Sequence, residues 1–358
     1  MLQTSAAFTS KARPRAVAIW LFFVAVMIVG IVVVGGITRL TESGLSITTW
    51  KPLSGILPPL NDAQWQAELA NYRTIDQSRT VHAGIALAAF KGLFFWEYIH
   101  RMIGRTIGLA FALPLIWFAL RRRIPKGYGR RLVALLALGA LQGALGWLMV
   151  RSGLRPGQVE VGHGWLAAHL LTALFTLAGM VWTALDLLDL ARNPYARPAR
   201  LRRMSVIVGI VLFTQLMYGA FTAGLRAGKA TPEWPLMYGR FFPGPSQTGR
   251  SFLDAVVDDP LIVQFIHRWF AFAAAAALMW LAIRATTAGS RAGFAIIALV
   301  TLQIILGIAT LMTGVQIDVA VAHQANAALL TIAAIVAAHA VGTQSRVSYY
   351  PSAKRHFA

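Results

Sequence analysis

Four histidines of this 358-residue chain share two short patterns, and all four stand in strongly apolar stretches. His100 and His267 each lie between an isoleucine and an arginine, while His169 and His323 each follow an alanine. An ionisable side chain inside a membrane span is costly and by default marks a functional site. Imidazole is a common axial ligand of haem iron and of other metals. The four histidines therefore predict two sites, each with two histidine ligands for a metal or a haem.

Two other interpretations of these histidines stay open. A lone buried histidine is often a hydrogen-bonded interior residue, although four in register across a repeat favour a shared function. A zinc or copper ion needs three or four ligands, whereas each half of the chain offers two such histidines, no cysteine and few carboxylates. Haem fits this set better. The remaining histidines lack a counterpart in the repeat and are interpreted as structural or surface residues: His82, His163, His339 and His356.

The two predicted sites differ in one acidic residue. Glu97 stands three residues before His100, on the same face of a helix, and Gln264 holds the matching position before His267. A carboxylate beside the first site could bind a proton, stabilise a cationic intermediate or orient water. The second site lacks that group and is suited to electron transfer alone. The alternative is that Glu97 is interfacial and solvated.

Arginines follow both leading histidines. Arg101 and Arg268 are the next residues after His100 and His267, and Arg105 stands one turn beyond Arg101. Arginines near the end of a span can extend to the membrane interface. The sharper interpretation is that these three bind the carboxylates of a haem, since arginine favours bidentate carboxylate recognition.

The elements that carry these residues are membrane spans. Hydrophobic residues make up 57% of the chain and charged residues 13%, which is too apolar for an ordinary soluble domain. Apolar runs of about 20 residues are typical of transmembrane helices. Each histidine is predicted to stand about four to eight residues, or roughly 6–12 Å, inside the outer end of its span. The sequence predicts an all-α membrane protein with eight transmembrane helices, at residues 16–38, 93–120, 132–150, 161–185, 204–224, 261–283, 292–313 and 318–341.

Charge sets the predicted orientation. The net charge is +20, and Lys and Arg crowd the N-terminus, the short connections within 121–131 and 192–203, and the C-terminal tail. The positive-inside rule places these segments, and both termini, in the cytoplasm, and we expect a bacterial inner membrane. No soluble basic domain is present to bind nucleic acid. The absence of cysteine excludes disulfides, thiolate catalysis, iron–sulfur clusters and covalently attached haem.

The first four spans resemble the last four. Because each half has an even number of spans, the two halves share one orientation and a symmetry axis along the membrane normal. We predict two pseudo-symmetric four-helix bundles, residues 1–190 with the first site and residues 191–358 with the second. The matches are Ile99-His100-Arg101 with Ile266-His267-Arg268, Leu141-Gln142-Gly143-Ala144-Leu145-Gly146 with Leu302-Gln303-Ile304-Ile305-Leu306-Gly307, Ala168-His169 with Ala322-His323 and, more weakly, Gly35-Gly36-Ile37-Thr38 with Gly219-Ala220-Phe221-Thr222.

The long outer loops carry two further signals. Residues 62–72 are predicted to form a short amphipathic helix, capped by Asn61 or Asp62. Aromatic and proline-rich segments, such as Trp234-Pro235-Leu236-Met237, could anchor the loops at the membrane interface or form a lid over a cofactor. The sequence does not decide between anchor and lid.

Taken together, these motifs resemble those of the haem A synthases of the alphaproteobacterial and mitochondrial branch, over nearly the whole chain. Some members of that family carry cysteine pairs in the outer loops, and this chain has none. A role for thiols in haem delivery is therefore not open to it. The resemblance rests on residues 35–46 (Gly35 to Ser46), Trp50-Lys51-Pro52, Leu57-Pro58-Pro59-Leu60, Glu97-Tyr98-Ile99-His100-Arg101, Leu166-Ala167-Ala168-His169-Leu170, Ala223-Gly224-Leu225-Arg226-Ala227-Gly228, Trp234-Pro235-Leu236-Met237 and Val263-Gln264-Phe265-Ile266-His267-Arg268.

The resemblance implies an oxidoreductase that converts the C8 methyl group of haem O to a formyl group by successive hydroxylations and loss of water, giving haem A for cytochrome oxidases. It implies that substrate haem lies between His100 and His169, with Glu97 as the catalytic carboxylate. It also implies a haem b cofactor between His267 and His323 that relays electrons. The expected partners are a haem O synthase and cytochrome oxidase assembly factors. The sequence does not name the electron donor or the oxidant, nor say whether the chain forms a homo-oligomer.

Two other functions stay open at this point. A di-haem b-type electron carrier would use the same four histidines without needing Glu97. A transporter built on a parallel repeat could use the histidines as a proton relay.

Overall fold

The computed structural model describes residues 11–50, 54–246 and 251–344, and every regular element in these ranges is a helix. Eight of the described helices are long and apolar enough to cross a membrane, so the prediction of an all-α membrane protein with eight spans is confirmed. Lys51, Pro52, His356 and the basic C-terminal tail, which entered the sequence analysis, lie outside the described ranges. The eight long helices are α1 (Pro14–Leu40), α4 (Leu87–Leu120), α5 (Gly129–Gly153), α6 (His163–Arg192), α7 (Arg203–Gly224), α9 (Pro260–Thr287), α10 (Ala292–Met312) and α11 (Ile317–Gln344).

Helix α4 begins earlier than predicted, at Leu87 instead of residue 93. Its first turns are covered by the short helix α2 (Asp62–Tyr72): Phe90 and Phe94 are buried in one cluster with Leu69 and Tyr72 of α2. That apolar cover stabilises the extra turns of α4 outside the predicted span. His100 consequently stands further from the start of its helix than the predicted span implied, while its depth within the membrane stays a prediction.

Helix α2 has the predicted bounds, and Asn61 caps it as one of the two residues proposed for that role. The Asn61 side chain accepts a hydrogen bond of 2.9 Å from the backbone N–H of Gln64, which satisfies one of the free amides of the first turn. Five further short helices of the described residues lie outside the long ones: α3 (Asp76–Thr80), α8 (Phe252–Asp258), and the 3-10 turns Ser43–Leu45 (η1), Ser54–Ile56 (η2) and Ala227–Lys229 (η3).

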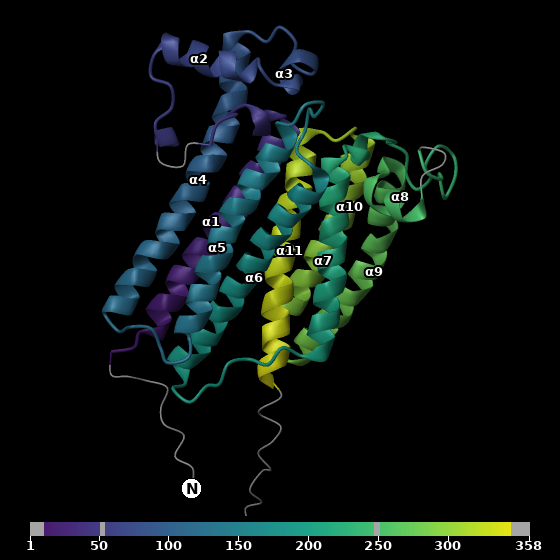
Figure 1. Cartoon of the computed structure of the whole chain (residues 1–358). Coiled ribbons are helices and arrows are strands. Elements are labelled where there is room, and N and C mark those ends of the chain that lie inside the picture. The colour runs from purple at the N-terminus through teal and green to yellow at the C-terminus, as the bar shows by residue number, and fades with distance from the viewer. Residues whose placement is uncertain (1–10, 51–53, 247–250, 345–358) are drawn as a thin grey trace, which may run out of the picture.

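The long helices run side by side, and the short ones gather at one end of the molecule. In Figure 1, α2, α3 and α8 lie at the upper end, while α1 begins and α11 ends at the lower end. An even number of spans requires this placement of the two ends. All four predicted site histidines stand in the half of their helices nearer to α2, α3 and α8, since even-numbered spans enter from that side.

Buried apolar side chains form two large clusters that follow the sequence repeat. The first joins α1, α4, α5 and α6 and includes Ala328 of α11, and the second joins α7, α9, α10 and α11. The two halves also contact each other directly, α6 against α7 and α1 against α11. Gln324 of α11 donates a hydrogen bond of 2.7 Å to the carbonyl of Val32 in α1. The separation of the halves into two independent bundles thus stays a prediction.

At the lower end of the molecule, Asp186 of α6 joins three segments. Its carboxylate accepts hydrogen bonds from Arg131 and from the backbone N–H of Ala199, each at 2.6 Å, and lies 3.1 Å from Nε2 of His339. Asp186 and His339 are both buried. His339 therefore has a structural role, connecting α11 of the second half to α6 of the first.

Candidate haem sites

Each of the four histidine rings rests against a glycine of the preceding long helix. A side chain on any of these glycines would meet the imidazole at about 3 Å, a closer contact than side-chain carbons normally make. The two glycines of the first half match the two of the second half in the repeat. Each half therefore has two such contacts between a glycine and a histidine ring, and we call the glycine surface under each ring its seat. The four pairs are His100 on Gly35, His169 on Gly146, His267 on Gly219 and His323 on Gly307.

The geometry of His267 and His323 fits a single iron between them. Their ring centroids are 6.5 Å apart, and the ring planes are nearly perpendicular at 87°. Two imidazole nitrogens that bind one metal ion from opposite sides at about 2 Å each place the ring centroids about 6 Å apart. The described residues contain no cluster of three or more His, Asp or Glu that could hold a free metal ion. The donor set of this half therefore fits a bis-histidine haem.

In the first half, His100 and His169 lie within electrostatic reach of each other. They stand on α4 and α6, the helices that correspond to α9 and α11 of the second half. The structure thus places the four predicted histidines on corresponding helices of the two halves, and a ring contact between partners is present for His267 and His323. Their identity as iron ligands stays a prediction.

Glutamines from the neighbouring helices hold three of the four rings. In each case the amide nitrogen lies beside Nδ1 of the histidine and donates to the backbone carbonyl of the same residue. A partner at Nδ1 restrains the orientation of the ring. A proton on Nδ1 would need an acceptor, which the amide offers only after a half turn that gives up its bond to the backbone carbonyl. The amide of Gln303 also lies 3.3 Å from Nε2 of His323. The pairs, with the distances to Nδ1 and to the carbonyl oxygen, are Gln142 with His169 (3.0 and 2.9 Å), Gln215 with His267 (3.1 and 3.0 Å) and Gln303 with His323 (3.2 and 3.1 Å).

Glu97 is buried and forms an ion pair within α4. Its Oε1 lies 2.6 Å from Nε of Arg101, and its side chain is only 5% exposed. The interpretation of Glu97 as a solvated interfacial residue is therefore wrong. Gln264, at the matching position of α9, is equally buried and donates to the carbonyl of Thr231 at 3.3 Å. The charge difference between the halves lies inside the protein, one turn from the histidine.

The arginines that follow His100 and His267 bind the outer loops. Arg101 donates to the carbonyls of Ile47 and Thr49 at 2.8 and 3.1 Å. Arg268 donates in the same way to Thr231, Glu233 and Leu236 at 2.8–3.3 Å. Nη1 of Arg105 lies 3.7 Å from the sulfur of Met102. Binding of haem carboxylates by these arginines stays a prediction.

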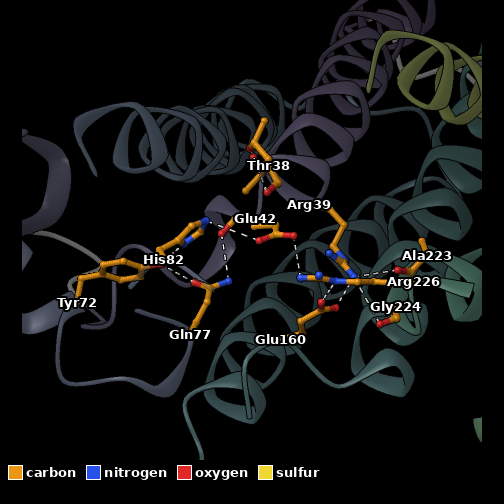
Figure 2. Close-up of polar contacts among 11 residues, drawn as sticks. Thr38, Arg39, Glu42, Tyr72, Gln77, His82, Glu160, Ala223, Gly224 and Arg226 are labelled. Carbon is orange, nitrogen blue, oxygen red and sulfur yellow. Dashed lines mark hydrogen bonds and ion pairs between the residues drawn. The ribbon is translucent and has the colours of Figure 1, made fainter. Parts of the chain in front are cut away.

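A network of charged residues joins the two halves at the ends of α1 and α7 (Figure 2). Arg39, at the end of α1, binds Glu160 at 2.5 Å and the carbonyl of Ala223 at 2.9 Å. Arg226, just after α7, binds both Glu160 and Glu42, the latter at 2.8 Å. The guanidinium groups thus cross from one half to the other, and Glu160 bridges them.

The same network continues to the short helices α2 and α3, next to the start of α4. His82 lies 3.6 Å from Glu42 and 2.6 Å from the hydroxyl of Tyr72, which also donates to Gln77 at 3.0 Å. Burial, together with the Glu42 carboxylate, raises the pKa of the Tyr72 hydroxyl, so the group stays a neutral donor. His82 is therefore a structural residue that fastens α2 and α3 to the end of α1.

A sequence profile of the family described as cytochrome oxidase assembly protein matches residues 18–335, which include all four histidines and Glu97. This chain belongs to that family. The resemblance read from the sequence motifs is confirmed.

Three bacterial relatives in this family are each named haem A synthase. The protein of Erythrobacter litoralis is 52% identical over 330 residues, which cover 92% of this chain and 98% of the relative. That of Sphingopyxis alaskensis is 50% identical over 338 residues, with 94% and 95% covered. That of Rhodopseudomonas palustris strain BisB5 is 45% identical over 350 residues, with 96% of each chain covered.

Several residues at the two candidate haem sites and in the charged network that joins the halves were not identified from the sequence alone. Gln142 and Gln303 lie in a motif that the repeat had already matched, but only the structure shows their amides against the histidines. Gln215 has no glutamine counterpart in the first half, and the repeat gave no sign of it. The contacts among Arg39, Glu42, Glu160 and Arg226 join loops far apart in sequence, which no local pattern predicts.

Proposed function

We propose that this protein is a haem A synthase of a bacterial inner membrane, which oxidises the C8 methyl group of haem O to a formyl group. Relatives that match nearly the whole chain bear that name, and the family is described as assembling cytochrome oxidase. Haem O is the substrate and haem A the product, which then serves cytochrome oxidase. A haem O synthase is the expected supplier of the substrate, and cytochrome oxidase assembly factors are the expected recipients of the product.

The difference between Glu97 and Gln264 carries the assignment of the substrate to the first half. Oxidation of a methyl group to a formyl group releases protons from the carbon, and a carboxylate near that carbon can accept them. Glu97 is the buried acid one turn from His100, and Arg101 holds it in place at 2.6 Å. Gln264 cannot take up a proton. We therefore assign substrate haem to His100 and His169, with Glu97 as the catalytic carboxylate.

His267 and His323 are the proposed ligands of a resident haem b. Gln215 and Gln303 fix both rings, and the ring spacing of 6.5 Å suits one iron. When bound, haem b supplies one-electron transfer to or from the substrate site. The protein's own contribution is to hold both ligands rigidly, because a cofactor that stays in place needs no freedom in its ligands.

Arg101, Arg105 and Arg268 are the proposed neighbours of the haem carboxylates. They lie at the end of the helices where the outer loops close over the sites. Because Arg101 and Arg268 already donate to loop carbonyls, a haem carboxylate would be an additional acceptor for them. The arginines would then couple loop position to haem binding.

The basic connections support the proposal that the end of the molecule with α2, α3 and α8 lies outside the cytoplasm. Arg121, Arg122 and Arg123 follow α4 directly at the lower end in Figure 1, where α1 begins and α11 ends. Positive charge in short connections marks the cytoplasmic side. Both termini are then cytoplasmic, and both haem sites lie in the outer half of the membrane.

The substitution Glu97→Gln tests this function. The variant, produced together with a haem O synthase, is expected to form no haem A while it keeps its haem b, as measured by extraction and chromatography of the haems. Asp62→Asn serves as the control, because Asp62 is an exposed carboxylate in the first turn of α2. The control is expected to form haem A at the wild-type level.

Other outcomes would support the competing functions. A normal yield of haem A in Glu97→Gln would remove the proposed role of Glu97. Wild-type protein that contains haem b alone, with no haem O or haem A, would favour an electron carrier. Wild-type protein without a Soret band under reducing conditions would favour a transporter with histidines in a proton relay.

A further inference from the structure

The first half lacks one of the glutamines that hold the histidine rings. Gln215 stands four residues before Gly219 on α7 and binds the His267 ring. The corresponding residue of α1, four before Gly35, is Ile31. Its side chain packs toward α4 beside Gly104, at 3.6 Å from the position of a Cβ there. Ile31 thus fills the place of the missing amide and offers no hydrogen bond.

His100 consequently has no hydrogen-bond partner for its ring among the described residues, whereas the other three histidines each have one. Its orientation also differs. Nε2 of His100 is the atom nearest to Gly35, at 3.2 Å from a Cβ placed there, whereas His169, His267 and His323 present Cε1 to their glycines. His100 and His169 make no ring contact like that of His267 and His323 in the described part of the chain. A half turn of the His100 ring would present Cε1 and Nδ1 to Gly35, as in the other three sites, and no hydrogen bond in the described part of the chain holds the ring in either orientation.

The helix that carries His100 is also less restrained than its counterpart. Only 17% of the most apolar window of α4 is buried, compared with 33% for α9. Helix α9 packs along α10, but α4 has few contacts with α5. An apolar pocket of about 560 Å³ adjoins the His100 face of α4 and is lined by Trp96, Ile37 and Val321. Trp96 stands four residues before His100, on the same face of α4, although His100 itself does not line the pocket.

We propose that His100 is the more readily exchanged ligand of the substrate haem and that His169 is the ligand that holds this haem more firmly. The inference rests on the proposed function, which assigns this half to the substrate. A substrate must reach its site and its product must leave, so both iron–histidine bonds of that site have to break in every cycle, one after the other. The bond to a ring that nothing holds breaks more readily than the bond to a ring fixed at Nδ1.

The exchange is a ligand dissociation without oxidation or reduction. The bond between iron and Nε2 of His100 breaks, the nitrogen keeps its electron pair, and Nδ1 keeps its proton. The iron stays bound to His169 and can take another ligand in the vacated position. Because residue 31 is not a glutamine, the barrier to dissociation of His100 from the iron is lower. Gln215 raises the corresponding barrier for dissociation of His267 from the resident haem.

Carbon monoxide binding to the reduced, haem-loaded full chain tests the proposal, because carbon monoxide binds ferrous haem only where an axial ligand leaves. The wild type is expected to bind it at one of its two haems, and His169→Ala is expected to lose that binding together with the substrate-site haem. Ile31→Gln is expected to slow the binding about tenfold, the effect of one or two hydrogen bonds on the His100 ring. Ile31→Leu keeps an apolar side chain and is expected to bind at the wild-type rate.

The reciprocal variant does not depend on the fate of Ile31→Gln. Gln215→Ile removes the clamp on His267 and is expected to make the second haem reactive toward carbon monoxide. The proposal is overturned if the wild type binds no carbon monoxide, if Ile31→Gln binds it at the wild-type rate, or if Gln215→Ile leaves the second haem inert.

The proposed function has a separate readout in the same samples. Extracts that contain haem b alone would contradict haem A synthesis, while the carbon monoxide rates of the two sites would still decide whether His100 is the loosely held ligand. Extracts with haem O or haem A, combined with equal rates at both sites, would contradict only the assignment of His100.

Discussion

Glu42 and Arg226 occupy the same place in the two halves of the chain, and they bind each other across the boundary at 2.8 Å. Each is the second residue after a long helix, α1 or α7, and each has a left-handed backbone with φ of 59° and 50°. Each also leads into a 3-10 turn, η1 or η3. A sequence repeat that placed one charge sign at both positions would set two like charges side by side. Because Glu42 and Arg226 carry opposite charges, the two equivalent turns form an ion pair that links the halves.

Glu160 completes this cross-link, and its loss should destabilise the fold. In Glu160→Gln, Arg39 and Arg226 lose the carboxylate that bridges them. We expect the free energy of unfolding to fall by about 1–3 kcal/mol, since these partly buried groups are screened less than surface pairs. Thermal unfolding in detergent measures the change. Asp62→Asn, on the exposed face of α2, is the control, and an equal loss in both variants would argue against the cross-link.

Gly219→Ala should expel haem from the second site. The added methyl group would lie 3.1 Å from Cε1 of His267, so the ring must leave the position that suits the iron. Gly209→Ala is a matched control on the same helix, because nothing lies within 4 Å of its Cβ position. We expect the haem b content to fall severalfold in Gly219→Ala and to be unchanged in Gly209→Ala, as measured from the Soret band per protein. Full haem content in Gly219→Ala would show that His267 does not need its seat on α7.

Much of this site was predictable because membrane spans and repeats leave strong signals in sequence. Long apolar runs fix the helices within a few residues, and the paired His-Arg and Ala-His motifs fixed the two histidine pairs. Helix α4 was predicted too short because its first turns depend on Leu69 and Tyr72, which contact it from a separate helix. Local hydropathy cannot register such tertiary cover.

The roles of polar side chains were predicted less well, because each depends on a partner distant in sequence. Arg101 and Arg268 were assigned to haem carboxylates, which stays a prediction, and the structure adds bonds to loop carbonyls that the sequence did not indicate. Gln215 binds a histidine on another helix, and Ile31 matters only because it stands where that glutamine would be. Contacts of this kind follow from the packing of helices and not from spacing within one helix.

Arg268→Gln should loosen the outer loop above the second site. Arg268 holds residues 231–236 through three carbonyls, and hydrogen bonds from a charged donor contribute about 1.5–3 kcal/mol each. We expect backbone amides of this loop to exchange with deuterium at least about tenfold faster in the variant, as measured by mass spectrometry. Arg101→Gln should produce the same change around residues 47–49 and leave 231–236 protected. Loosening of both loops by either substitution would point to general unfolding instead.

Asp186→Asn should destabilise the protein at the other end, far from both haem sites. The carboxylate receives Arg131, His339 and the amide of Ala199, and its side chain is 1% exposed. An asparagine keeps the shape but presents an N–H group to the guanidinium of Arg131, which leaves a charge without its partner. We expect a loss of about 2–4 kcal/mol in the free energy of unfolding, with an unchanged haem spectrum in the protein that stays folded. Asp189→Asn is the matched control, since Asp189 pairs with the exposed Arg192 at 3.5 Å and should change stability by less than about 0.5 kcal/mol. Similar unfolding temperatures for the two variants would contradict the role of Asp186 as the junction of α5, α6 and α11.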